Sequence, residues 1–268
     1  MTRFVHITDL HVSHPDSGDP GLHSDTPARL KRVVEIVNAM EARPDFLIAS
    51  GDLTNRGDEE SYRLVKSTLA ALEVPTILAL GNHDKRPGFH EVFGEGPSDR
   101  PYYHQAVIAG LHVITLDTSI PDRVSGRICD EQFDFLKQAL AAEPDAPKLL
   151  VMHHPPRVDP DGLPWGSIDM ASTERLGEMI AGRPVIGILS GHIHINQVNH
   201  WHGVPILVAS GQHSTVDLLE RRDLKIVEGG GLGLCVWRPT GLSVSFVPLA
   251  PQSEEIGVID RARLLKFS

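Results

Sequence analysis

Short clusters of metal-binding and acid/base side chains recur along the chain, which has 15 histidines in 268 residues. Five clusters stand out, namely Asp9-Leu10-His11, Gly51-Asp52, Gly81-Asn82-His83-Asp84, His153-His154 and Gly191-His192-Ile193-His194. Imidazole, carboxylate and amide donors without thiolate are typical of sites for Mn, Fe, Zn or Co, whereas structural zinc sites usually contain cysteine. About seven donors are available, namely Asp9, Asp52, Asn82 and at least four histidines. This number suits two divalent ions that share a bridging carboxylate better than it suits one tetrahedral ion.

Each cluster follows a short apolar run. Runs rich in Val, Ile and Leu predict buried strands at 3–8, 46–50, 76–80, 112–116, 148–152, 185–189 and 205–209. Because sites in open α/β sheets form beyond the carboxyl ends of the strands, we expect the five clusters to meet in space. We also expect the Asp-x-His and His-x-His pairs to lie on one face of an extended segment, since side chains alternate there with a period of two.

Amphipathic stretches between these runs predict helices. Apolar residues recur with helical spacing in 27–42 and 58–72, and a third helix contains Phe133, Leu136 and Leu140. A fourth contains Leu176, Met179 and Ile180, and we expect Ser172 or Thr173 to be its N-cap. The alternation of strands and helices favours an α/β sandwich with parallel strand pairs.

The last part of the chain has a different pattern. Arg238-Pro239-Thr240-Gly241 separates two apolar runs within 232–248, which predicts an antiparallel hairpin that contributes to a second sheet. No internal repeat or linker interrupts the sequence, so we expect residues 1–268 to form a single domain.

Composition limits the classes of partner. The net charge of −10 argues against binding a nucleic-acid polymer or an anionic membrane through bulk charge. No run of about 18 apolar residues predicts a membrane span, and no leader pattern opens the sequence. Two cysteines are too few for a disulfide framework, so we expect a cytoplasmic protein. Whether it forms a homo-oligomer stays open.

The five clusters resemble, in order, the motifs of the calcineurin-like metallophosphoesterase superfamily, over roughly residues 3 to 213. Within it, 51–57 (GDLTNRG) and His153-His154-Pro155-Pro156 resemble bacterial class III cyclic nucleotide phosphodiesterases and the related glycerophosphodiesterases. The resemblance implies an α/β fold, a four-layer sandwich in which two central mixed β-sheets are flanked by helices. It also implies two divalent metal ions per chain.

The resemblance further assigns roles to single residues. The implied metal ligands are Asp9, His11 and His194 for one ion, Asn82, His153 and His192 for the other, and Asp52 as the bridge. His83 matches the histidine that acts on the substrate. His153 follows its strand directly and is therefore the expected ligand, which leaves His154 to line the pocket. His213 falls near a histidine that contacts substrate in some relatives.

A phosphodiesterase mechanism follows from these charges. Two divalent ions outweigh the negative charges of Asp9 and Asp52, so a small anionic phosphodiester can enter a positive site on an acidic chain. We expect in-line attack on phosphorus by a metal-bridging hydroxide, assisted by His83. The expected substrates are 3',5'-cyclic nucleotides, cAMP foremost. Glycerophosphodiesters, or a broad-specificity phosphodiesterase and phosphonate esterase activity, are the alternatives.

Rival functions share parts of the pattern. Protein Ser/Thr phosphatases of the same superfamily typically carry Asp-Arg-Gly where this chain has Asn55-Arg56-Gly57. A DNA repair nuclease is disfavoured because no basic stripe or aromatic series accompanies the clusters. A non-catalytic interaction scaffold on the same fold is the alternative of another class, although such members usually lose His83 or the ligands. Trp165 is either a platform for substrate or an oligomer contact.

Overall fold

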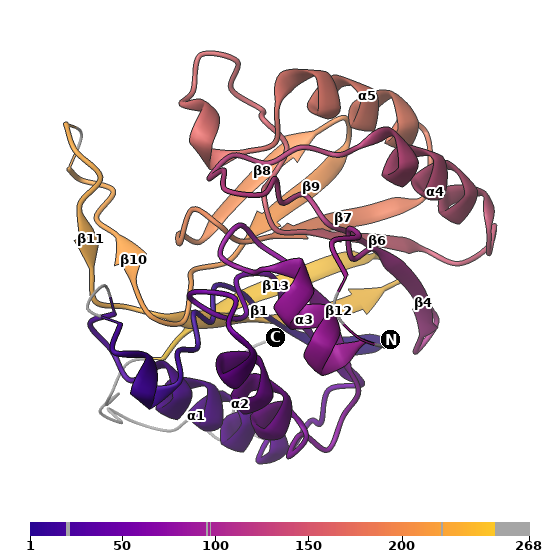
Figure 1. The fold of residues 1–268 in the computed structure, drawn as a ribbon. Coiled ribbons are helices and arrows are strands. Elements are labelled where there is room, and N and C mark those ends of the chain that lie inside the picture. Colours follow the sequence, from indigo (N-terminus) through magenta and orange to yellow (C-terminus); the bar gives the residue numbers. More distant parts are fainter. Residues whose placement is uncertain (20–21, 95, 97, 221, 250–268) are drawn as a thin grey trace.

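Two large β-sheets and five α-helices make up most of the computed structural model, which describes residues 1–19, 22–94, 96, 98–220 and 222–249 (Figure 1). The five-stranded sheet has the order β13 (Gly241–Pro248), β12 (Gly231–Arg238), β1 (Thr2–Ile7), β2 (Phe46–Ser50) and β3 (Thr76–Ala79). The six-stranded sheet has the order β4 (His104–Ile108), β5 (Leu111–Leu116), β6 (Lys148–Met152), β7 (Val185–Ser190), β9 (Val204–Val208) and β8 (Gln197–Trp201). A separate hairpin pairs β10 (Thr215–Val216) with β11 (Ile226–Val227).

Both large sheets are mixed. Parallel pairs join β1, β2 and β3 in one sheet, and β5, β6, β7 and β9 in the other. Antiparallel pairs add β12 and β13 to one edge of the first sheet, whose other edge is the parallel strand β3, and antiparallel β4 and β8 form both edges of the second sheet. The parallel centre aligns the carboxyl ends of the strands that precede the clusters, which is the arrangement expected of an α/β site.

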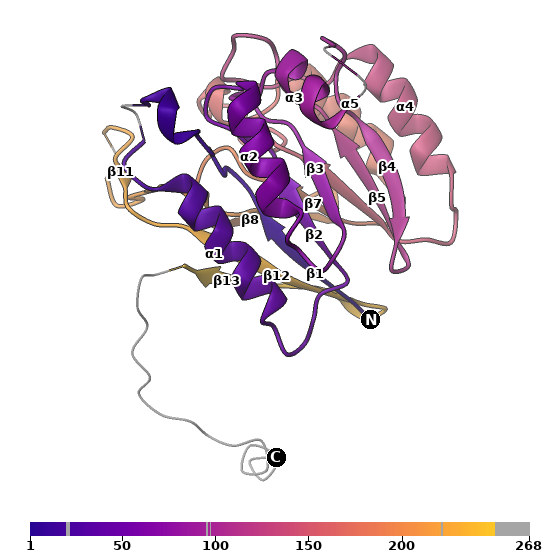
Figure 2. The ribbon, with the colours of Figure 1, turned by 60° about the horizontal axis from the view of Figure 1, so that its bottom comes forward.

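The helices cover the two outer faces of this pair of sheets (Figure 2). On the five-stranded sheet lie α1 (Thr26–Asn38), α2 (Glu59–Leu69) and α3 (Arg86–Phe93), and on the six-stranded sheet lie α4 (Asp130–Ala141) and α5 (Met170–Ile180). Strand alternation divides the core, because Val5 and Ile7 face the helices whereas Phe4 stacks on Phe46 with ring centroids 5.1 Å apart, between the sheets. The expected four-layer α/β sandwich is confirmed.

The hairpin at the end of the described chain differs from expectation in its location. β12 pairs antiparallel with β1, with Phe4 opposite Cys235, so it extends the sheet that contains β1 to β3 instead of forming part of a second one. This pairing satisfies the backbone hydrogen-bonding edge that β1 would otherwise expose.

Other elements were not expected from the sequence. The edge strands β4 and β8 have alternating, half-exposed side chains instead of an apolar run. Helix α3 begins at Arg86-Pro87-Gly88 without a side-chain cap. The N-cap of α5 is Asp169, which accepts a hydrogen bond from the backbone N of Ser172 at 2.7 Å. Ser172 and Thr173 are therefore within the helix, and the expected cap was wrong.

Among the described residues, no helix has the length and apolar composition needed to cross a membrane.

Candidate metal centre

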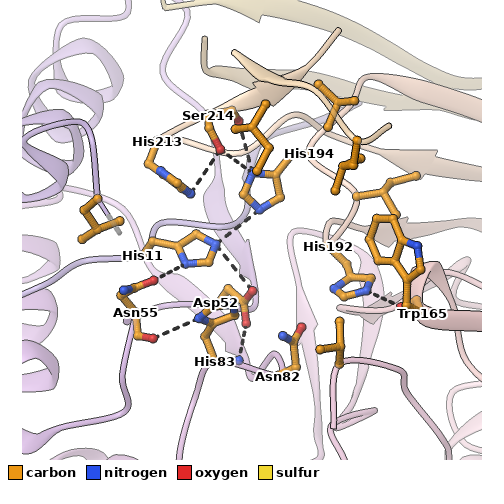
Figure 3. A pocket seen from close by; sticks show the side chains of 16 residues that line it. His11, Asp52, Asn55, Asn82, His83, Trp165, His192, His194, His213 and Ser214 are labelled. Carbon is orange, nitrogen blue, oxygen red and sulfur yellow. Dashed lines mark hydrogen bonds and ion pairs between the residues drawn. The ribbon is translucent and has the colours of Figure 1, made fainter. Parts of the chain in front are cut away.

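The donor clusters meet at the carboxyl ends of the two parallel strand sets. Asp52 follows β2 of one sheet and His153 follows β6 of the other, yet Oδ2 of Asp52 lies 3.2 Å from Nε2 of His153. Nε2 of His194 lies 3.2 Å from Oδ1 of Asp9 and 3.3 Å from Nε2 of His11. Figure 3 shows the labelled donors facing a common space, with Asn82 and His192 on its other side. The expectation that clusters far apart in the sequence converge is confirmed.

The backbone reaches this geometry through left-handed conformations. Five of the nine non-glycine residues with positive φ in the described chain are candidate ligands, namely Asp9, His11, Asp52, His192 and His194. Each costs about 1 kcal/mol or more for a residue with a Cβ, and such outliers concentrate at functional sites. We expected the Asp-x-His and His-x-His segments to be extended because of their spacing. The positive φ angles show that they are not. The left-handed conformations at Asp9 and His11 direct these two side chains into the site, whereas the side chain of Leu10, between them, is buried in the core.

Glycines permit the close approach of neighbouring loops. Gly51 has a φ of 112°, and a Cβ added there would lie 2.6 Å from Nδ1 of His153. A Cβ added at Gly81 would collide with Oδ1 of Asp52. The glycines that precede Asp52 and Asn82 thus leave room for the donors of the other loops.

Unpartnered polar atoms show that the donor set fits metal ions. Among the described residues, Oδ1 of Asn82 is buried without a hydrogen-bond partner, and Nε2 of His153 makes no hydrogen bond but faces Oδ2 of Asp52 at 3.2 Å. The other ring nitrogen of His153 lies 3.0 Å from the carbonyl of Ser50, which fixes the ring and leaves Nε2 as the free donor. Metal-binding histidines are usually oriented in this way through their second nitrogen. Buried polar atoms left unpaired are costly, and a cation between them would remove that cost.

The same orientation occurs at two further histidines. Nδ1 of His11 lies 3.0 Å from Oδ1 of Asn55, and Nδ1 of His194 lies 3.1 Å from Oγ of Ser214. In both rings Nε2 therefore points to the carboxylates. His192 differs, because its Nε2 lies 2.6 Å from the carbonyl of Trp165 and Nδ1 is the nitrogen left for an ion.

The electrostatics of the buried site favour additional positive charge. Burial alone would raise the pKa of Asp52, but the charges of His153 and His11 outweigh it and hold that pKa well below its usual range. Burial lowers the pKa of His153, whereas Asp52 and Asp9 raise it to about 9. The pKa of His11 falls to about 3, mainly through burial. Two fully buried carboxylates thus need cations as counter-charges, which divalent ions supply when bound.

His83 lies at the edge of this donor set and lines the pocket. Its Nδ1 is 2.9 Å from the carbonyl of Asn55 and so carries the proton, which leaves Nε2 for a bound molecule. Its backbone N donates to Oδ1 of Asp52 at 2.8 Å. The ring also contacts that of His11, edge to face, with centroids 4.6 Å apart.

The two remaining candidates have different surroundings. His213 lines the pocket, with its Nε2 3.1 Å from Oγ of Ser214 and its ring centroid 4.6 Å from that of His11. His154 is fully buried and absent from the pocket lining. Its Nδ1 lies 2.8 Å from Oγ1 of Thr118, and its Nε2 lies 2.9 Å from the carbonyl of Val124. This geometry favours a role for His154 in holding the 118–124 segment over direct contact with substrate.

Sequence reasoning missed two residues that hold the histidines. Asn55 contacts both His11 and His83, and its Nδ2 also donates to Asp19. Ser214 fixes His194. The position of Asn55, three residues after Asp52, was a usable signal, although we weighed it only against the phosphatase pattern.

Asp84 links the loops of Asp52 and Asn82. Its carboxylate accepts backbone hydrogen bonds from Leu53 at 3.0 Å, Thr54 at 3.1 Å and Gly81 at 2.9 Å, and a fourth from the hydroxyl of Tyr62 at 3.0 Å. A fully buried carboxylate with this many donors fixes the relative position of the two loops.

Comparison with known proteins decides the family. A family model described as calcineurin-like phosphoesterase matches residues 2–196, most of the chain. The chain belongs to this family. A probable cyclic nucleotide phosphodiesterase of Rhodococcus erythropolis is 35% identical over 219 residues, which cover 80% of this chain and 72% of that protein. A cAMP/cGMP dual specificity phosphodiesterase of Mycobacterium tuberculosis is 32% identical, over 85% of this chain and 71% of that protein.

Two further relatives extend the comparison. A probable glycerophosphodiester phosphodiesterase of Arcobacter nitrofigilis is 28% identical, over 87% of this calcineurin-like chain and 88% of that protein. Among solved structures, a dimetal phosphatase from Danio rerio has a TM-score of 0.63 at 13% identity, covering 94% of this chain and 99% of that one, which shows a shared fold. The expected superfamily, fold and class of metal-dependent phosphoesterase are confirmed, and the Asp and His clusters fit a metal site.

Proposed function

We propose that this calcineurin-like phosphoesterase hydrolyses small phosphodiesters, foremost 3',5'-cyclic nucleotides such as cAMP, with two divalent ions held by Asp9, His11, Asp52, Asn82, His153, His192 and His194. Mn, Fe, Zn and Co all suit this donor set. One observation carries the preference for a nucleotide, namely that apolar side chains, Trp165 among them, line the same pocket as the polar donors.

The pocket has a volume of about 360 Å³ and a lining of mixed polarity. Its polar lining residues include the histidines, Asp52, Asn55 and Asn82. Its apolar lining residues are Leu22, Val124, Trp165, Ile193, Val216, Leu224 and Ile226. The last three come from the β10–β11 hairpin region, which projects from the body of the molecule (Figure 1). A nucleoside presents a flat apolar base next to its phosphate and so matches a pocket that combines apolar side chains with polar donors, whereas glycerol offers only hydroxyls.

The relatives support the same substrate class. Those in Rhodococcus and Mycobacterium are named for cyclic nucleotides, while the Arcobacter relative is named for glycerophosphodiesters. The cyclic nucleotide relatives are the more similar in sequence, and a glycerophosphodiester is therefore the second candidate.

The residues of the site have separable roles in this proposal. Bound divalent ions supply Lewis acidity toward the phosphoryl oxygens and lower the pKa of water. Asp52, between His11 and His153, would hold both ions. His83 holds a proton on Nδ1 for Asn55 and presents Nε2 to the substrate, where its protonated form donates to the leaving alkoxide. Trp165 and the other apolar residues that line the pocket orient the base.

We also propose that the protein is located in the cytoplasm. Both cysteines of the chain, Cys129 and Cys235, are free thiols, which suits the reducing cytoplasm. A single domain over 1–268 stays a prediction, supported by the core that the two sheets share and with 250–268 outside the described residues.

A panel of diesters tests the function. The metal-loaded protein is assayed with cAMP, glycerophosphocholine and bis(p-nitrophenyl) phosphate after reconstitution with Mn, Zn, Co or Fe. We expect all three to be hydrolysed, with the highest kcat/KM for cAMP among the two natural diesters. A higher kcat/KM for glycerophosphocholine would favour the second candidate. Full metal occupancy without turnover of any diester would favour the non-catalytic scaffold.

A further inference from the structure

A second cavity of about 250 Å³ adjoins the metal pocket. The two share four lining residues, Asn55, Asn82, His83 and Val124, so His83 lies on the border between them. The remaining lining consists of Arg56, Lys85, Asp122 and Arg123. We call this second space the anion cavity, because three of its four remaining side chains are cationic.

The charges of the anion cavity are only partly balanced. Lys85 pairs with Asp122, Nζ to Oδ1 at 3.0 Å, and Arg56 pairs with Asp19, Nε to Oδ2 at 3.2 Å. Within the described part of the chain, no carboxylate pairs with the guanidinium of Arg123. The chain as a whole has a net charge of −10, so an excess of cations beside the metal pocket is a local departure from its average surface.

The segment that carries Arg123 is fixed by several backbone hydrogen bonds. Its backbone N donates to the carbonyl of Ile120 at 3.0 Å, closing a turn in which Asp122 has a φ of 60°. The next carbonyl, of Val124, contacts Nε2 of His154 at 2.9 Å. The backbone N of Arg127 donates to the carbonyl of Thr118 at 2.9 Å. Arg123 therefore sits on a preorganised loop that is attached to the buried ring of His154.

We propose that the anion cavity binds a second phosphoryl group of the substrate, so that diesters bearing an additional phosphate are preferred over otherwise identical diesters without one. This inference rests on the proposed function and narrows its substrate class. A phosphoryl group carries up to two negative charges and three acceptor oxygens, which match a guanidinium flanked by further cations. cAMP has a single charge and leaves the cavity unfilled while it reacts at the metals.

A matched pair of chromogenic diesters tests the proposal. Thymidine 5'-(p-nitrophenyl phosphate) and its 3'-phosphorylated derivative have the same scissile diester and the same leaving group. With metal-loaded protein at low salt, we expect a kcat/KM about fivefold or more higher for the 3'-phosphorylated substrate, since charge-assisted contacts at exposed cations are individually modest. The preference should shrink toward unity at about 0.5 M salt, because exposed charges are screened there.

Three variants locate the preference. Arg123→Gln should reduce the ratio of the two kcat/KM values to about twofold or less, and Asp122→Asn, which releases Lys85 from its ion pair, should raise it. Arg32→Gln is the matched control, because Arg32 is exposed on α1, pairs with Glu35 at 3.7 Å and lies outside both cavities. A ratio of unity in the unaltered protein, or a ratio unchanged by Arg123→Gln, would overturn the proposal.

A binding measurement separates this proposal from the proposed function. Calorimetry compares thymidine 3',5'-bisphosphate with thymidine 5'-phosphate, and needs no turnover. We expect tighter binding of the bisphosphate and loss of that advantage in Arg123→Gln. If neither diester is hydrolysed yet the bisphosphate is preferred through Arg123, the proposed function fails and the anion cavity stands. Equal affinity for both nucleotides, with diesterase activity intact, rejects the anion cavity alone.

Discussion

Oδ2 of Asp52 lies 3.2 Å from Nε2 of His153, although the two side chains follow strands of different sheets. Both are almost fully buried, and Oδ2 is also 3.6 Å from Nε2 of His11. Asp52 thus lies between donors contributed by the five-stranded sheet and a donor contributed by the six-stranded sheet. The metal centre depends on how the two sheets pack, and a bridging carboxylate is the natural role for a residue in this position.

Asp52→Ala should abolish diesterase activity through loss of the bridge. Removing one buried carboxylate leaves His11 and His153 without the charge that they face, so we expect weaker binding of at least one ion. Metal content by mass spectrometry of the purified variant, measured beside kcat, checks this. Full activity with full metal content would refute the assignment of Asp52.

His83→Ala should retain the metals while losing most turnover. General acid assistance contributes about 10²- to 10⁴-fold, so we expect a fall of that order in kcat with cAMP, whose leaving ribose alkoxide needs a proton. His83→Gln keeps a hydrogen-bond donor of similar reach. It should therefore bind the diester better than His83→Ala does, but its kcat should stay low because glutamine cannot transfer the proton. Unchanged turnover in His83→Ala, with the metal content of the unaltered protein, would remove His83 from the mechanism.

Asp84→Asn should destabilise the loops that carry Asp52 and Asn82. The substitution places an amide N–H₂ among backbone donors that now bind a carboxylate, at a cost of about 2–4 kcal/mol in the free energy of unfolding. Urea denaturation of the metal-free protein measures it. Asp16→Asn is the control, because Asp16 is 93% exposed and should change stability by less than about 0.5 kcal/mol. Equal stability of the two variants would contradict the linking role of Asp84.

Trp165→Ala should raise KM for cAMP more than for glycerophosphocholine. Stacking of a base on an aromatic ring is worth about 1–3 kcal/mol, which corresponds to about 5- to 150-fold in KM. Trp165→Phe keeps a stacking face and should recover part of the loss. Steady-state kinetics with both diesters provides the comparison, and equal losses for the two substrates would indicate a structural role for Trp165.

The sequence predicted the elements whose side chains are buried on both faces. β2, β6 and β7 are mostly apolar, β1 contains Phe4, Val5 and Ile7, and the polar cluster after each strand marked where the site forms. β4 and β8 alternate between half-buried and exposed positions, so they lack such a signal. β12 pairs with β1 because that edge of β1 is free once β1 has paired with β2. Which edge is free becomes clear only in the assembled sheet.

Within the site, residue types were easier to anticipate than their geometry. Glycine, aspartate and histidine at strand ends indicated metal chemistry, but the left-handed φ angles of 51° at Asp9 and 44° at His11 are set by the contacts of the folded loops. The burial of His154 behind the pocket depends likewise on Thr118 and Val124, which lie 30 or more positions away in the chain.

The central claim is that two divalent ions in this site enable hydrolysis of a phosphodiester, and a metal titration of activity tests it most directly. Chelator-treated protein is titrated with Mn²⁺ while cAMP hydrolysis is followed. We predict no activity before addition and a rise that levels off at about two equivalents per chain. Undiminished hydrolysis after complete removal of metal, or no hydrolysis of cAMP or any other diester with two equivalents bound, would contradict the account.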